Sequence, residues 1–181
     1  MNAKKEAHTI ARVQDGETEL FADLVQYYQA SLFRVVTNML GGSQVEDIVQ
    51  EVFLAAFKNI GKYNSDKGLF RTWLFRIARN KTINTLKKKK RESYQKMPEL
   101  IDRHTPAEKV LCKEVFLKLD QALSSLKPQD RMIFVWAEVE ELPYAEIARI
   151  EGLPLGTVKS RLFRTKAKLK TLIASYVNDD E

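Results

Sequence analysis

Residues 144–168 read YAEIARIEGLPLGTVKSRLFRTKAK, and this stretch decides the fold of the C-terminal part of the chain. Ile147 and Ala148 face inward on a short helix, and Ala148 is small enough to lie where two helices cross. Gly152 allows the backbone to reverse direction, and Thr157 opens a second helix. The spacing predicts a helix-turn-helix, with an ordinary basic helical hairpin as the alternative.

The second helix of this motif has an apolar face and a basic face. Val158, Leu162 and Leu169 fall near the first face. An arginine on the second face can read guanine by a bidentate contact, whereas lysines mostly hold phosphates. The outward residues suit the major groove of DNA: Lys159, Ser160, Phe163, Arg164 and Lys168.

Residues 63–91, YNSDKGLFRTWLFRIARNKTINTLKKKKR, interleave aromatic side chains with basic ones. Cations beside π-faces are the chemistry that holds unstacked bases. Phe70 and Trp73 are spaced with Ile77, which favours a place in the core over base stacking. Asn80 is better placed to read bases, because an amide recognises base edges. The Lys87–Arg91 run indicates only non-specific phosphate contact.

Charge is distributed unevenly along the 181 residues, whose 30 basic and 24 acidic side chains give a net charge of +6. Residues 67–91 hold 10 basic and no acidic residues, and residues 155–172 hold 6 and none. Each block can neutralise its own run of phosphates. Residues 119–154 are different, since they hold 3 basic and 7 acidic residues.

Residues 45–57, VEDIVQEVFLAAF, predict an amphipathic helix with an acidic outer face. That face carries Asp47, Gln50, Glu51 and Leu54. Composition alone favours the interpretation that this face is an ordinary solvent-exposed surface. A docking surface for a protein partner is the other interpretation, because Leu54 is exposed in its middle.

Apolar residues recur at helical spacing and no alternating strand pattern occurs, so we expect an all-α chain of two small helical domains joined by a flexible linker. The expected boundaries are 1–93, 94–112 for the linker, and 113–181 for the domain with the helix-turn-helix. Helices are expected over 70–90, 110–125, 128–140, 144–150 and 155–176. The composition of residues 1–10 is typical of a loose chain end.

The composition excludes several kinds of chemistry. One cysteine, Cys112, rules out an internal disulfide framework, and two distant histidines make a metal site a poor prediction. Neither a signal peptide nor a membrane span is visible, so we expect a soluble, cytoplasmic protein. No Walker loop, acid–base pair or nucleophile triad appears, so we expect no cofactor and no enzymatic activity.

Three runs in this order, EDIVQEVFLAAF, FRTWLFRIARNKTIN and YAEIARIEGLPLGTVKSRLFRTKAKL, resemble the extracytoplasmic-function (ECF) sigma factors of bacterial RNA polymerase. The resemblance covers roughly residues 15–172. It implies that 1–93 is the sigma region 2 domain and that 113–181 is the region 4 domain. Promoter melting in this family uses the binding energy of captured bases rather than nucleotide hydrolysis by the sigma factor.

The resemblance also implies partners and site residues. The partners are core RNA polymerase, through its clamp coiled coil and its flap, promoter DNA, and an anti-sigma factor that is often membrane-tethered, with no membrane insertion by this chain. The implied residues are Asp47, Gln50, Glu51 and Leu54 for the clamp; Tyr63, Lys67, Arg71, Arg76, Arg79, Asn80 and Asn84 for the minus-ten element; and Thr157, Lys159, Ser160, Phe163, Arg164 and Lys168 for the minus-thirty-five element.

Two other functions fit parts of the sequence. A free-standing repressor or activator would use the helix-turn-helix equally well, but it gives no role to Asp47, to Leu54 or to the aromatic–basic helix. A nucleic-acid-processing enzyme would need converging metal ligands, which the acidic helix does not supply.

Overall fold

The computed structural model of the chain describes residues 1–42, 44–95 and 121–178. Every regular element in these ranges is a helix, and no strand occurs in them. The prediction of an all-α protein with two helical domains is confirmed. Residues 96–120 lie outside the described ranges, so most of the predicted linker and of the helix expected over 110–125 is not described.

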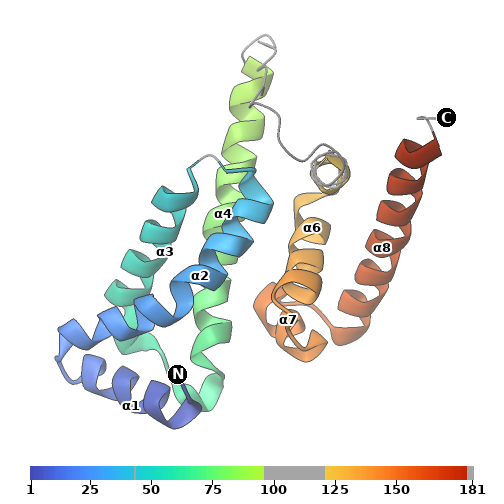
Figure 1. The fold of residues 1–181 in the computed structure, drawn as a ribbon. Helices are drawn as coiled ribbons and strands as arrows, with labels where there is room; N and C mark the ends of the chain where they lie inside the picture. The colour runs from blue at the N-terminus through green and yellow to red at the C-terminus, as the bar shows by residue number, and fades with distance from the viewer. Residues whose placement is uncertain (43, 96–120, 179–181) are drawn as a thin grey trace.

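Four helices make up the N-terminal half: α1 (Ala3–Gln14), α2 (Phe21–Leu40), α3 (Val45–Asn59) and α4 (Phe70–Gln95). A short 3₁₀ turn over Thr18–Leu20 lies between α1 and α2, and two more, over Ile60–Lys62 and Ser65–Lys67, lie between α3 and α4. Helices α2, α3 and α4 pack against one another, and α1 closes one end of this bundle (Figure 1). Helix α4 continues five residues beyond the end at Lys90 that the sequence predicts.

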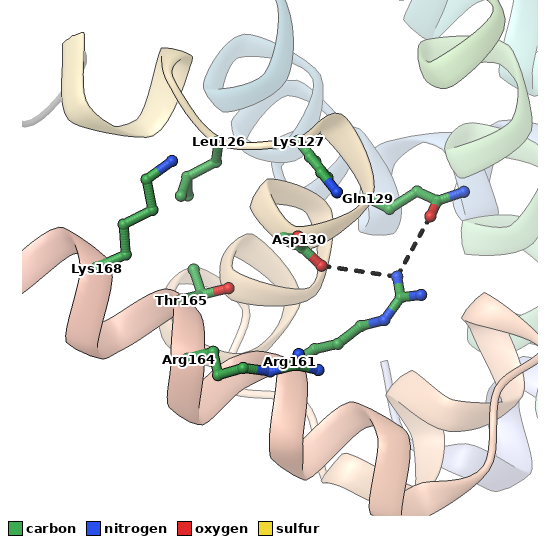
Figure 2. Close-up of a pocket in the computed structure, with 8 residues that line it drawn as sticks. All are labelled: Leu126, Lys127, Gln129, Asp130, Arg161, Arg164, Thr165 and Lys168. Carbon is green, nitrogen blue, oxygen red and sulfur yellow. Dashed lines mark hydrogen bonds and ion pairs between the residues drawn. The ribbon is translucent and has the colours of Figure 1, made fainter.

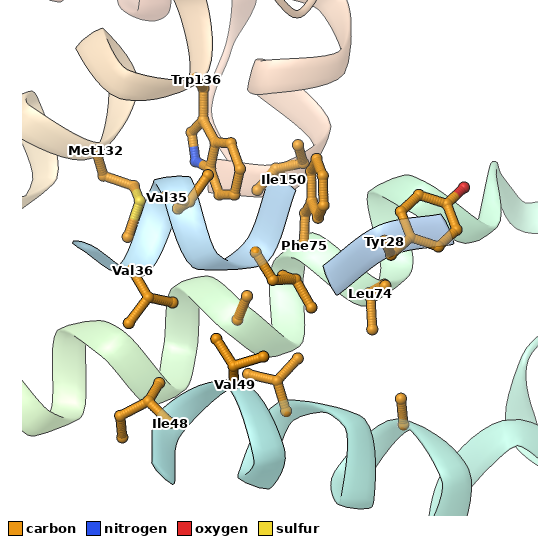
Figure 3. Close-up of a cluster of buried hydrophobic side chains, with 14 of the residues drawn as sticks. Tyr28, Val35, Val36, Ile48, Val49, Leu74, Phe75, Met132, Trp136 and Ile150 are labelled. Atoms are coloured by element: carbon orange, nitrogen blue, oxygen red, sulfur yellow. The ribbon is translucent and has the colours of Figure 1, made fainter. Parts of the chain in front are cut away.

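The apolar stripes that the sequence shows form the core of this bundle. Leu24 and Leu32 of α2, Val52 of α3 and Ala78 of α4 have no exposed surface, and Leu74 has 1%. Their spacing of three and four residues puts each on the inner side of its helix, where burial of a leucine contributes about 1.5 to 3 kcal/mol. Figure 3 shows this cluster between the three helices.

The N-terminus is helical, so the expected loose end over residues 1–10 is wrong. The Asn2 side chain caps α1 by accepting a hydrogen bond from the backbone N–H of Lys5 at 2.8 Å. Ile10 and Val13 are each 4% exposed and join the core. Composition alone did not show this helix, because few apolar residues on one face suffice once they pack on a larger bundle.

The C-terminal half consists of α6 (Pro128–Phe134), the π-helical segment η4 (Val135–Val139), α7 (Tyr144–Glu151) and α8 (Leu155–Asn178). The helix expected over 128–140 is thus an α-helix that changes to a π-helix at Val135. Helices α7 and α8 form the predicted helix-turn-helix. At its turn Gly152 has φ +66°, and the backbone N–H of Leu153 donates to the Ala148 carbonyl at 3.0 Å.

The two halves share one continuous apolar core. Helix α4 packs against α7, and α2 packs against η4 and α6 (Figure 1). At the centre of the contact the rings of Phe75 and Trp136 stack with centroids 4.8 Å apart and planes 18° apart (Figure 3). Both rings are almost completely buried, so Phe75 is not available to stack on a base in this arrangement.

Candidate nucleic-acid interface

The outer face of α8 is exposed as the sequence predicts. Lys159, Ser160, Arg164 and Lys168 are exposed, Thr157 is half-buried, and Phe163 is 75% exposed. On the inner face, Val158 and Leu162 pack in the core and are 0% and 3% exposed. An aromatic ring this open to water beside cations suits contact with the apolar parts of a base edge. A groove runs beside it, bounded by Tyr144, Gly156 and Leu162 among others.

A second basic surface lies between α8 and the start of α6. A cavity of about 390 Å³ is lined by two predicted DNA contacts, Arg164 and Lys168, together with Lys127 and Arg161 (Figure 2). Arg161 bonds Gln129 at 3.3 Å and lies 3.6 Å from Asp130. Four cations against one carboxylate provide the chemistry that suits phosphate groups.

Sequence reasoning missed Lys127 and Arg161 as members of this surface. Arg161 belongs to the acid-free block 155–172, and that position could have identified it. Lys127 lies 34 residues before it in sequence, where no local pattern connects the two. Only the packing of α6 on α8 brings them together.

The loop before α4 forms a small pocket of about 190 Å³ with mixed aromatic and basic walls. Tyr63, Leu69 and Trp73 line it, together with Lys67 and Arg76. The Tyr63 hydroxyl donates to the Gly68 carbonyl at 3.0 Å, and burial raises the pKa of the phenol. The centroid of the Tyr63 ring lies 5.6 Å from the centroid of the Trp73 ring. An apolar slot rimmed by cations is the chemistry that holds an unstacked base.

Phe70 and Trp73 differ in burial in the structure, although the sequence predicts a place in the core for both. Phe70 is 1% exposed and belongs to the core, as expected. Trp73 is half-buried: it packs on the core with one part of its ring and lines the pocket. The expectation that it is a core residue is therefore only partly right.

Helix α4 carries its polar residues on two different stripes. Arg76, Asn80 and Asn84, spaced by four, are exposed. Arg71 and Arg79, also on a four-residue spacing with Phe75 between them, turn toward the C-terminal half. The predicted minus-ten residues are therefore not gathered on one open surface in this structure.

Arg71 and Arg79 each meet a buried carboxylate of α7. Arg71 is bidentate to Glu146, with Nε donating to Oε1 at 2.8 Å and Nη2 donating to Oε2. This pairing raises the pKa of the guanidinium. Arg79 donates to Glu151 at 3.1 Å. Burial raises the pKa of the Glu151 carboxyl, while Arg79 and the indole N–H of Trp136 act in the opposite direction.

The acidic face of α3 is fully open to solvent. Asp47, Gln50, Glu51 and Leu54 are all exposed, and Leu54 is 57% exposed. Glu51 accepts a hydrogen bond from Lys81 of α4 at 2.7 Å, so part of its charge is neutralised within the chain. In Figure 1, α3 lies on the side of α4 away from α7 and α8.

Within residues 1–42, 44–95 and 121–178, none of the helices has the length and apolar character to cross a bilayer. No group of three or more His, Cys, Asp or Glu side chains is close enough there to hold a metal ion.

Two family models match the chain in the order that the motifs predict. Sigma-70 region 2 matches residues 24–92, and Sigma-70 region 4 matches residues 116–169. The ECF RNA polymerase sigma factor SigW of Bacillus subtilis is 32% identical over 174 residues, which cover 89% of this chain and 92% of that protein.

Solved structures show the same fold. CnrH, solved with the cytosolic domain of CnrY, matches with a TM-score of 0.69 at 24% identity over 92% of this chain and 96% of that one. The sigma factor RpoE of Bartonella quintana, solved with the anti-sigma factor NepR, gives 0.68 at 22% identity over 85% and 96%. With two ordered sigma regions and a full-length relative of this similarity, the chain belongs to the ECF sigma factors of bacterial RNA polymerase.

Proposed function

We propose that this sigma factor contacts the transcription machinery through three separate surfaces of the chain: the acidic face of α3, the pocket and exposed stripe at α4, and the outer face of α8. The observation that carries the proposal is that each surface is exposed and has the chemistry its partner requires. The α3 face is acidic with an apolar centre, and the other two are basic with aromatic rings.

The α3 face docks on the clamp coiled coil of core polymerase. Leu54 supplies apolar surface in the middle of the contact, and the exposed Asp47 supplies negative charge at its edge. Apolar centres with charged rims are the usual anatomy of protein interfaces. Gln50 and Glu51 complete the contact, and Glu51 shares its charge with Lys81.

The minus-ten element is bound at the start of the region 2 helix. A base flipped from the duplex enters the pocket that Tyr63 and Trp73 line, and stacking in such a site is worth about 1 to 3 kcal/mol per base. Lys67 and Arg76 hold the backbone beside it. Asn80 and Asn84 follow on the exposed stripe, while Arg71 and Arg79 join only when they leave α7.

The minus-thirty-five element is read in the major groove by α8. Lys159, Phe163 and Arg164 reach base edges, with Thr157 and Ser160 beside them, and Lys168 belongs to the cationic cavity of Figure 2. Arg164 now donates to the Ser160 carbonyl at 3.2 Å. This bond uses Nε and leaves both Nη groups, which can together make a bidentate contact with a guanine.

We place this function in the cytoplasm, where promoter DNA and polymerase are found, and assign the chain no enzymatic activity. We further propose that an anti-sigma factor binds it. The support is that a protein of the same fold, the sigma factor RpoE of Bartonella quintana, was solved with the anti-sigma factor NepR. The domain boundaries at 93 and 113 are part of this proposal, with 94–112 as the connection.

Reconstitution with core polymerase and a library of promoter fragments tests the function. The complex should select fragments that share two elements and should transcribe from them, whereas core enzyme alone should not. If the chain never associates with core enzyme and instead protects a palindromic duplex by itself, the repressor or activator interpretation replaces this one.

A further inference from the structure

The pocket at the start of α4 is formed mainly by one irregular segment, residues 60–69, which we name the pocket loop. Six of the nine residues that line the pocket belong to this loop. Within residues 60–69 only Ile60, at the start, is buried. A segment with so little buried surface needs hydrogen bonds to keep a single conformation, because burial does not offset the entropy of ordering it.

The hydrogen bonds within the pocket loop fix its individual turns. The backbone N–H of Tyr63 donates to the Ile60 carbonyl at 3.0 Å, and that of Gly68 donates to the Ser65 carbonyl at 3.3 Å. The Tyr63 hydroxyl joins the two turns through the Gly68 carbonyl. Because both partners of each bond belong to the loop, these bonds do not set its position on the helical bundle.

Gln14, the last residue of α1, connects the pocket loop to the bundle. Its Nε2 donates to the carbonyl of Ile60 at 2.7 Å and to the carbonyl of Tyr63 at 3.0 Å. Both partners are acceptors, so the two hydrogens of the amide fix its orientation. One side chain thus holds the carbonyl at the start of the turn Ile60–Lys62 and the carbonyl just after its end.

The end of α1 is a firm support for this contact. Val13, the neighbour of Gln14, is buried in the core. Arg12 is bidentate to Glu17, with Nε donating at 2.7 Å, and the Glu17 backbone N–H donates to the Arg12 carbonyl at 3.0 Å. Helix α1 also packs against the turn Ile60–Lys62 (Figure 1). The position of the Gln14 amide is therefore set by the bundle and not by the loop.

The consequence falls on Tyr63, an aromatic wall of the pocket. Gln14 holds its carbonyl, the Gly68 carbonyl holds its hydroxyl, and the ring of Phe70 packs edge-on with centroids 5.3 Å apart. A wall that is already ordered does not have to be ordered when a ligand enters, and such preorganisation increases affinity.

We propose that Gln14 is a positioning residue for base capture: it holds the pocket loop in the conformation that receives a flipped base of the minus-ten element. It acts through Tyr63 and does not touch DNA, since both of its amide hydrogens are used on the loop. The identity of the ligand rests on the proposed function, whereas the support of the loop does not. The Sigma-70 region 2 match begins at residue 24, so this role belongs to a helix that lies before it.

The first experiment measures the pocket loop without DNA or polymerase. Hydrogen exchange in the full chain, followed by mass spectrometry of its peptides, reports the opening of residues 60–69. Gln14→Ala and Gln14→Glu should both accelerate this exchange about tenfold, a factor of about 3 for each hydrogen bond lost. The glutamate keeps the size of the side chain but has no hydrogen to donate. Gln14→Lys should restore slow exchange, because an ammonium group can donate to both carbonyls.

Gln29→Ala is the matched control, because it removes an exposed amide from α2. It should leave the exchange of the pocket loop unchanged. Exchange in residues 45–59 of α3 should be the same in all variants, which would show that the effect is confined to the loop. Wild-type exchange of the pocket loop in Gln14→Glu would overturn the proposal.

The second experiment measures what the positioned loop does. Core polymerase with the full chain is bound to pre-melted templates of the promoter selected in the reconstitution, with single abasic sites placed in turn along the minus-ten element. Wild-type affinity should fall at the position whose base enters the pocket. Gln14→Ala should bind the intact template about fivefold more weakly than wild type, because fewer of its loops are in the competent conformation. On the template that lacks the captured base, the two proteins should bind equally.

A purely structural role for Gln14 predicts a different result. Gln14→Ala would then bind the intact template and every abasic template more weakly by the same factor, and this outcome would overturn the positioning role. A wild-type chain whose binding is weakened by none of the abasic sites would refute base capture as the function of the pocket. Faster exchange in Gln14→Glu would even then establish Gln14 as the support of the loop.

Discussion

Leu54 offers the most direct test of the polymerase-docking surface. The side chain is 57% exposed in the free chain. Complete burial of a leucine is worth about 1.5 to 3 kcal/mol, so covering the exposed fraction should contribute about 0.9 to 1.7 kcal/mol. Leu54→Ala should therefore weaken binding to core polymerase about 5- to 18-fold.

Asp47→Ala should add a different kind of defect. Asp47 is exposed at the edge of the same face, where a charge mainly affects the association rate and its salt dependence. It is a better choice than Glu51, because Lys81 already neutralises part of the Glu51 charge. The double variant should bind more weakly than Leu54→Ala at low salt, and this difference should shrink as salt is added.

Titration of labelled chain with core enzyme, followed by fluorescence anisotropy, measures both effects. Phe33→Ala is the matched control, since Phe33 is also an apolar side chain, 37% exposed, but belongs to α2. Affinity of Leu54→Ala within twofold of wild type, with Phe33→Ala equally unaffected, would show that the acidic face of α3 is not the docking surface.

Three further substitutions test other parts of the chain. Arg164→Ala should change the preferred bases at the upstream element in a promoter-library selection; a uniform loss over all sequences would make it a phosphate contact. Asn80→Ala should slow open-complex formation on duplex promoters more than on a pre-melted template, and equal slowing on both would place its contact after opening. Thr82 is completely buried, and its hydroxyl has no hydrogen-bond partner within the described residues. Thr82→Val should therefore raise the free energy of unfolding by about 1 kcal/mol in urea titration. Thr72→Val, which removes the bond to Glu146, should lower it; a loss of stability in both would contradict this reasoning.

The features predicted from the sequence are those with a local cause. Gly152 and Ala148 define the turn of the helix-turn-helix because a left-handed residue and a small crossing residue leave a signature within ten positions. The exposed faces of α3 and α8 follow from helical periodicity in the same way. The aromatic–basic block around Tyr63 predicted a nucleic-acid site, and the structure arranges part of it as a pocket.

The contact between the domains could not be predicted, because its partners are far apart in sequence. Arg71 and Glu146 are separated by 75 positions, and Arg79 and Glu151 by 72. Each residue by itself fits an ordinary exposed position on an amphipathic helix. The helix α1 escaped prediction for a related reason, since Ile10 and Val13 stabilise it only by packing on the rest of the bundle.

The placement of α3 on the outer side of α4 sets an order of events. Its docking residues are accessible in the same arrangement in which Arg71 and Arg79 are paired with Glu146 and Glu151. In this arrangement the free chain presents its docking face to polymerase while two of its predicted DNA contacts are engaged within the chain. Molecules in excess of polymerase would then remain available to bind the enzyme rather than chromosomal DNA. Their abundance would control the competition among sigma factors for core polymerase rather than promoter occupancy.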